Sequence, residues 1–309
     1  MYVKQLRDAG PVLLLDAGNA LFESTFSADG KAKAKAELIL RVMGEMKTAA
    51  MAVGARDLAL GPEFLLQTSR KVGVPVLSAN LTRDSKPIFP ASTVVTASGV
   101  KVGLVGVSPA IQGLDRYPGL RGEPPVRAAL AEAAKLRGKV DLLIALAAVS
   151  WADALQLSKE GAGVFDFVIQ SGEQRGAGVM QRNDRNFVLS AGERGRAVSK
   201  LDLDLSGSGP LVDLAEIERD RARRRNLEMQ IESVKQRVAG ERDPAILKSY
   251  QQTLASFQDQ LQQLRQNDPE ARAKGARTAR LAIQFLDESV ASDPALKAEV
   301  DKYGPPPEH

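Results

Sequence analysis

The stretch LLIALA, Leu142–Ala147, decides the fold class, because six consecutive apolar residues leave neither face of the segment polar. It is too short for an average helix and follows Asp141, so it is typical of a central strand whose sheet is covered by helices on both faces. Similar short runs recur along the chain up to about Leu205, separated by stretches of helical periodicity. This alternation predicts a layered α/β domain.

The other expected elements follow from the same two patterns, with Gly, Pro, Asn or Asp at most of the boundaries. Strands are expected at Pro11–Leu15, Met51–Val53, Val74–Leu77, Thr93–Thr96, Val100–Val107, Val140–Ala147, Val164–Ile169, Asn186–Leu189 and Ala197–Leu205. Helices are expected at Ala32–Thr48, Pro62–Val72, Val126–Gly138 and Trp151–Glu160.

A different periodicity begins after the turn-forming run Ser206–Pro210. Two segments carry apolar residues at spacings of mostly three and four, as in the a/d seam of a coiled coil. The seam residues are Ile217, Leu227, Ile231, Val234 and Val238, then Leu247, Tyr250, Leu254, Phe257, Leu261 and Leu264. Asp243-Pro244 forms a helix start between the segments, so they predict an antiparallel hairpin of two helices.

Further helices are expected after the hairpin. Asn267-Asp268-Pro269 repeats the stop-and-start signal, and Leu281, Ile283, Leu286 and Val290 indicate a third helix at about Glu270–Ala291. Asp293-Pro294 would start a fourth, short helix. The sequence thus predicts an α/β domain at residues 1–205, a linker at 206–212, a helical hairpin with terminal helices at 213–303, and a tail at 304–309.

Composition excludes several kinds of chemistry. The 309 residues include no cysteine and one histidine, His309, so disulfides, thiolate metal sites and Ser-His-Asp catalysis are excluded. The net charge of +4 is small beside 42 basic and 38 acidic residues, and Arg219–Arg225 is typical of a solvated helix face, so nucleic acid is not an expected partner. No apolar run approaches the ~20 residues of a membrane span. Because a buried-type strand starts at Val12, we expect Met1 to lie inside a longer natural chain.

Seven blocks, in order over about 200 residues, resemble the metallophosphoesterase domain of the periplasmic 5′-nucleotidases. They lie at residues 12–19 (VLLLDAGN), 52–61 (AVGARDLALG), 76–81 (VLSANL), 99–107 (GVKVGLVGV), 141–150 (DLLIALAAVS), 166–174 (DFVIQSGEQ) and 190–196 (SAGERGR). The resemblance implies a four-layer α/β sandwich with a two-metal site at the strand ends. It also implies a periplasmic or outer-surface location.

The family's metal-binding and acid residues are replaced in these blocks. The replacements are Asn19, Ala55, Arg56, Ala148, Gly172 and Gln174, where the family carries Asp, Asn and His. Amide, alanine and arginine side chains do not suit two divalent cations. We therefore expect no catalytic residue, no metal ligand and no cofactor. The remaining cleft would be formed by Asn19, Arg56, Asp57, Gln174 and Arg175.

Three functions remain open. The leading hypothesis is a non-catalytic pseudoenzyme module for binding or scaffolding, with a protein partner at the helical hairpin or the cleft. The alternative is a 5′-nucleotidase-type phosphoesterase with an unusual site. The third is an anion or nucleotide binder in which Arg56 and Arg175 replace the metal charge, although we expect Arg56 to pair with Asp57 or another carboxylate. Some relatives of this degenerate type continue into multihaem segments, and the tail would be a plausible entrance to one.

Overall fold

The computed structural model describes residues 1–26, 29–110, 116–172, 180–183, 185–190, 192, 195–266 and 268–303. The candidate residues Gln174 and Arg175 and the tail at 304–309 lie outside this range. The chain divides into two compact units. The first comprises Met1–Lys200 with Ile283–His309, and the second comprises Leu201–Ala282.

A six-stranded sheet forms the centre of the first unit, in the order β11-β12-β10-β9-β7-β6. Its strands are β6 (Ser92–Ala97), β7 (Val100–Val107), β9 (Leu142–Ala147), β10 (Phe167–Gln170), β11 (Met180–Asn183) and β12 (Asn186–Ser190). The four inner strands are parallel, and the two edge strands pair antiparallel to their neighbours. The sequence LLIALA is thus an inner strand, and all six of its residues are buried.

Two smaller sheets and the helices complete this unit. The parallel sheet contains β1 (Leu15–Asp16), β2 (Ala50–Ala52) and β3 (Val76–Leu77), and the antiparallel sheet contains β4 (Leu81–Arg83), β5 (Lys86–Pro87) and β8 (Leu120–Gly122). The helices are α1 (Tyr2–Ala9), α2 (Gly30–Glu45), η1 (Arg56–Leu58), α3 (Gly61–Val72), α4 (Pro125–Leu136), α5 (Trp151–Glu160), α9 (Pro294–Val300) and η2 (Asp301–Tyr303).

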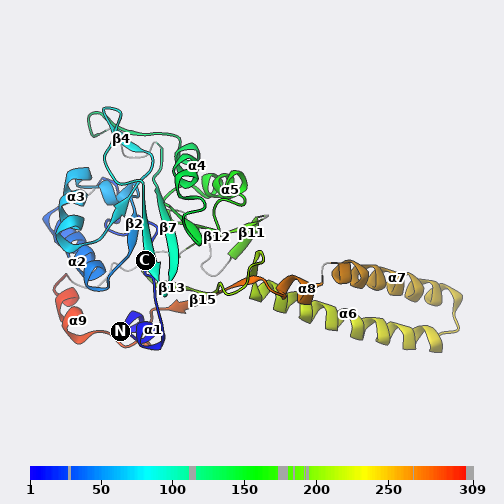
Figure 1. The fold of residues 1–309 in the computed structure, drawn as a ribbon. Coiled ribbons are helices and arrows are strands. Elements are labelled where there is room, and N and C mark those ends of the chain that lie inside the picture. The colour runs from blue at the N-terminus through cyan, green and yellow to red at the C-terminus, as the bar shows by residue number, and fades with distance from the viewer. Residues whose placement is uncertain are drawn as a thin grey trace. The chain divides into compact units, whose positions relative to one another are not determined.

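The β1-β2-β3 sheet and the six-stranded sheet pack face to face between two helical layers. Met51 of β2 lies in one apolar cluster with Leu40 of α2 and Leu65 of α3. Val105 of β7 lies in another, with residues of α4 and α5. Figure 1 shows α2 and α3 on one side of β2, and α4 and α5 beyond β7. The order helix, sheet, sheet, helix confirms the expected four layers.

Contact between the two sheets depends on a glycine. A Cβ atom at Gly106 of β7 would overlap the backbone and side chain of Leu77 in β3, so a side chain at this position would push the sheets apart. The Ala79 N–H also donates to the Gly106 carbonyl at 2.8 Å. This close approach brings the carboxyl ends of strands from both sheets to one edge of the sandwich.

The predicted elements of the first unit mostly appear, and β7 and α5 have the predicted bounds. Six short elements among the described residues of this unit were not predicted: α1, η1, β4, β5, β8 and β11. Most contain only two to four residues, which is too short for a periodic pattern to show. The final segment is tied to this unit by an ion pair between Glu299 of α9 and Arg41 of α2.

The second unit contains two long helices, α6 (Leu214–Gly240) and α7 (Pro244–Gln266), which run side by side in Figure 1. Leu227 and Ile231 of α6 and Leu261 of α7 are buried between them. The seam residues Leu254, Phe257 and Leu264 pack against this cluster. We call α6 and α7 the helical pair; its coiled-coil character stays a prediction. Among the described residues, no helix is both long and apolar enough to span a membrane.

The expected third helix at Glu270–Ala291 is wrong. Helix α8 covers only Pro269–Ala273, Gly275 adopts a φ of +69°, and β15 (Arg277–Phe285) follows. Leu281, Ile283 and Phe285 are two residues apart, so they lie on one face of an extended strand. The helix was expected because Ile283, Leu286 and Val290 are three and four residues apart, which fits a helical period.

β15 lies between two strands of distant sequence, β13 (Ala197–Asp204) and β14 (Leu211–Asp213). β14 pairs with β15 in parallel, with Leu211 opposite Arg277. Leu211 and Val212 are buried, so the end of the expected linker at 206–212 is a strand. One of the two strands that pair with β15 therefore lies mostly in the segment expected to be a linker.

Candidate functional site

The carboxyl ends of β1, β2 and β10 bring together three loops at one edge of the sandwich, which we call the strand-end site. Ser171, after β10, donates from Oγ to the carbonyl of Ala17, after β1, at 2.6 Å. Asn19 contacts both Ser171 and the loop after β2, through the Arg56 N–H. The structure thus places Asn19, Arg56 and Asp57 together.

Asp57 organises this site through backbone hydrogen bonds. Its Oδ2 accepts from the N–H groups of Asn19 at 2.6 Å and Gly54 at 2.8 Å, and its Oδ1 accepts from Leu21 at 3.1 Å. The residue is fully buried. Both carboxyl oxygens therefore hold the β1 and β2 loops against each other.

Burial raises the pKa of Asp57 to about 7. The three N–H donors oppose this shift, and the negative charge of Asp16 adds to it. Burial also raises the pKa of Asp16, whose Oδ1 accepts from the Gly18 N–H at 2.7 Å. The site therefore contains two carboxyl groups that resist ionisation.

Asn19 fills the space between the loops. Its φ of +65° is left-handed, a conformation that Asn tolerates better than most residues. Its side-chain Oδ1 accepts from the Arg56 N–H at 3.2 Å, and its Nδ2 donates to Ser171 Oγ at 3.4 Å. A Cβ atom at Gly54 would collide with the Asn19 amide, and one at Gly172 would lie 3.2 Å from its Nδ2. Both glycines therefore leave room for this side chain.

Arg56, the first residue of η1, is partly exposed at this edge. Among the residues that the structure describes, no carboxylate or carbonyl pairs with its guanidinium. The expectation that Arg56 pairs with Asp57 is wrong, because backbone N–H groups already bind both Asp57 oxygens. The strand-end site thus presents a cation that pairs with no carboxylate of the described residues.

A two-metal centre, which the resemblance implies for the fold, does not fit these residues. Ala55, Ala148 and Gly172 have no donor atoms in their side chains, and both Asp57 oxygens are engaged inside the protein. Across the described ranges, no three His, Cys, Asp or Glu side chains converge as a metal site would require. The described residues of the site can bind and orient groups, but their side chains do not supply the ligands of two cations.

Two polar features near the strand ends were not identified from the sequence, namely Ser171 and a cluster of Ser78, Asn80 and Ser108. Ser171 directly follows a predicted strand, and that position was its only signal. The second group links Asn80 to Ser108 after β7: the Asn80 Nδ2 donates to the Ser108 carbonyl at 2.8 Å, and the Ser108 N–H donates back to Asn80 Oδ1 at 2.9 Å. Ser108 Oγ also donates to Ser78 Oγ at 2.8 Å. These buried groups satisfy one another, which is typical of a structural role.

Comparison with solved structures identifies the fold. The chain matches a 5′-nucleotidase precursor from Thermus thermophilus with a TM-score of 0.53 and 20% identity, over 66% of this chain and 44% of that one. It matches the Thermus thermophilus sulfate thiohydrolase SoxB with a TM-score of 0.55 and 17% identity, over 66% of this chain and 39% of that one. It matches the calcineurin-like phosphoesterase YfkN of Bacillus subtilis with a TM-score of 0.53 and 18% identity, over 65% of this chain and 74% of that one.

Sequence comparisons do not assign the chain to a family. No protein-family profile matches the chain, and no curated protein sequence matches it. The chain spans less than half the length of the first two structural neighbours. At these identities the comparisons bear on architecture, and together with the four layers they show that the first unit has a metallophosphoesterase-like fold.

Proposed function

We propose that this chain is a non-catalytic, metallophosphoesterase-like module that binds or scaffolds. The observation that carries the proposal is the bonding of Asp57. A carboxylate among the loops after the strands is buried, has a pKa raised to about 7, and uses both oxygens to fix backbone N–H groups. Asn19 fills the adjoining space. These bonds favour a fixed loop structure over a metal-activated water.

A phosphoesterase with an unusual site is the alternative. The solved neighbours are named after enzymes, including a 5′-nucleotidase, an NAD nucleotidase and a calcineurin-like phosphoesterase, and their names favour this alternative over a binding module. We favour binding because the side chains of the strand-end site, rather than the layers of the fold, would have to perform the hydrolysis.

Metal content separates the two proposals. The purified chain is incubated with Mn²⁺, Fe²⁺ or Zn²⁺, passed through a desalting column and analysed by mass spectrometry of the metals. We expect well under one equivalent of retained metal. Two retained equivalents that are lost in an Asn19→Ala variant would contradict the proposal and favour the hydrolase.

Anion binding at Arg56 is a second candidate function. Its guanidinium has no partner among the described residues, and a planar guanidinium matches phosphate oxygens well. Millimolar phosphate or AMP should therefore raise the melting temperature of the wild type, but not that of Arg56→Ala. Arg70→Ala, an exposed arginine in the last turn of α3, is the matched control and should retain the shift. No shift in the wild type would exclude this candidate.

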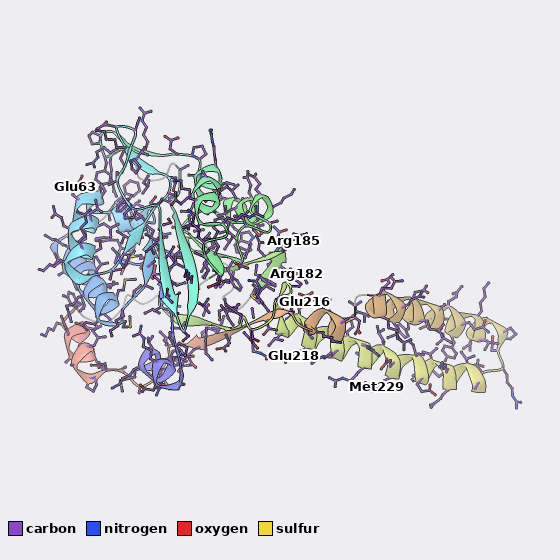
Figure 2. All side chains as sticks on the ribbon, in the orientation of Figure 1. Glu63, Arg182, Arg185, Glu216, Glu218 and Met229 are labelled. Carbon is purple, nitrogen blue, oxygen red and sulfur yellow. The ribbon has the colours of Figure 1, made fainter. Side chains whose placement is uncertain are left out.

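The helical pair is the partner surface that we propose for scaffolding. Arg272 of α8 fixes the base of α6 through ion pairs with Glu216 at 2.8 Å and Asp220 at 3.0 Å. Towards the other end, Met229 of α6 and Ile246 of α7 are exposed apolar side chains. Figure 2 labels Glu216 and Met229 along α6. A periplasmic or outer-surface location is also part of this proposal.

A further inference from the structure

The edge of the six-stranded sheet at β6 has a free row of backbone groups. Among the described residues, β6 pairs only with β7, through a two-residue turn in which Ser98 has a φ of +50° and Gly99 a φ of +82°. Positive φ at both central residues is the signature of a tight hairpin turn whose twist matches its strands. The hairpin therefore fixes which β6 residues bond to β7.

The register shows which backbone groups point away from the sheet. Ala97 lies opposite Val100 across the turn, and beyond the other end of β6 the Gly106 N–H donates to the Ala91 carbonyl at 3.1 Å. In an antiparallel pair, bonded and non-bonded positions alternate. The residues bonded to β7 are thus Ala91, Thr93, Val95 and Ala97. The N–H and C=O groups of Ser92, Val94 and Thr96 point outward.

No described group bonds to these outward positions. β6 is the last strand of its sheet, and none of the three residues has another backbone partner in the described chain. Val94 is 46% exposed, and Thr96 is also exposed. The Ser92 side chain is held against α4 by its bond to Glu132 at 2.6 Å, which keeps it close to the sheet.

β6 also lacks the residues that usually protect an edge strand. Its sequence, STVVTA, contains no charge, no proline and no glycine. Lysine, proline or an inward charge would normally discourage pairing with another chain. The opposite edge strand of the same sheet, β11, carries Arg182, which Figure 2 labels near Arg185. Of the two edge strands of this sheet, β6 is therefore the one without a charged residue.

We propose that β6 binds the β6 strand of a second copy of this chain, antiparallel across a two-fold axis at Val94. Val94 then lies opposite its counterpart, and Ser92 lies opposite Thr96 of the other copy. All three positions present outward N–H and C=O groups, so each pair forms two backbone hydrogen bonds. The two six-stranded sheets become one continuous sheet.

A second copy fits this edge because the segment is self-complementary. A two-fold interface requires the same surface on both partners, and Ser, Val and Thr meet Thr, Val and Ser in this register. An uncharged strand also places no like charges opposite each other. The two exposed Val94 side chains would lie on the same face of the joined sheet and cover each other.

The register can be tested by cysteine cross-linking, because the chain has no cysteine of its own. Opposite Cα atoms at a bonded pair are about 5.5 Å apart, within reach of a disulfide. Val94→Cys should therefore give a reducible dimer under mild oxidation. Thr96→Cys alone should not, because its two copies would be four strand positions, or about 13 Å, apart. The double variant Ser92→Cys/Thr96→Cys should cross-link again.

Solution mass gives an independent test with the unmodified chain. Light scattering at micromolar concentration should give twice the 33.1 kDa of the monomer for the wild type. Val94→Lys should halve this mass. Val300→Lys is the matched control, because Val300 of α9 is 47% exposed, and its dimer should persist. A monomeric wild type, a dimer that survives Val94→Lys, or cross-linking of Thr96→Cys alone would overturn the proposal.

Discussion

Asp57 explains why the strand-end site has its present form. The sequence places it in the loop after β2, beside Arg56, which suggests an ion pair between neighbours. The structure instead shows three backbone donors on the carboxyl group. Backbone N–H groups have no signal in a sequence, so the type and place of Asp57 could be predicted, but its partners could not.

Removing the Asp57 carboxyl group should destabilise the first unit. Asp57→Ala leaves three N–H groups in a buried loop without an acceptor, and we expect the free energy of unfolding to fall by about 3 kcal/mol. Chemical denaturation followed by the fluorescence of Trp151, the single tryptophan, measures this change. Asp141→Ala is the control: this exposed carboxylate accepts one N–H from Lys101 and should cost less than about 1 kcal/mol. Equal losses would contradict the assigned role.

The raised pKa of Asp57 predicts a pH dependence of stability. Between its ordinary value of 3.8 and about 7, the folded protein holds the proton more tightly than the unfolded chain does. The contribution of this group to stability is therefore full below its ordinary pKa of 3.8 and is lost as pH rises through about 7. The stability of the wild type relative to Asp57→Asn, which does not titrate, should fall across this window. A stability difference between the two proteins that stays constant or grows with pH would contradict the raised pKa of Asp57.

At the scale of elements, period and length decided which predictions were confirmed. LLIALA and the strand Val100–Val107 are long, apolar and bounded by turns, and both are inner strands of the sheet. β15 was misread as a helix because Ile283, Leu286 and Val290 are three and four residues apart, which fits a helical spacing. Its strand form depends on pairing with β13 and β14, far away in sequence. Local periodicity does not contain that information.

The helical pair should unfold separately from the sandwich. The partly buried Leu254 packs against the buried Leu227, Ile231 and Leu261, and a charge there would lie against this apolar cluster. Leu254→Asp should therefore remove most of the helical circular dichroism of α6 and α7. The fluorescence of Trp151, which reports on the first unit, should stay unchanged. Gln252→Asp, an exposed position on the same helix, should leave both signals intact.

A change of Trp151 fluorescence in Leu254→Asp alone would contradict this separation. It would mean that the second unit, Leu201–Ala282, supports the sandwich. The contacts of the described residues favour independence, because each unit has its own buried apolar cluster. The first unit ends its main part at Lys200 and takes up the chain again at Ile283, and this return could not be predicted without the strand β15.

At the scale of the whole molecule, the layers of the fold resemble those of phosphoesterases, whereas the side chains of the strand-end site favour a binding module. The four layers are those of solved phosphoesterases, and the order of sequence blocks was enough to predict them. The strand-end side chains are instead bonded to one another and to the backbone. A fold is kept by the apolar faces of its sheets and helices, whereas hydrolysis depends on a few polar residues, so one can persist without the other.

Phosphate release from AMP is the measurement that tests the central claim most directly. The 309-residue chain is assayed with and without millimolar Mn²⁺, beside an Asn19→Ala variant prepared in the same way. A non-catalytic module predicts no release above the buffer background in any sample. Metal-dependent release by the wild type that disappears in Asn19→Ala would contradict the account and identify the strand-end site as a working phosphoesterase.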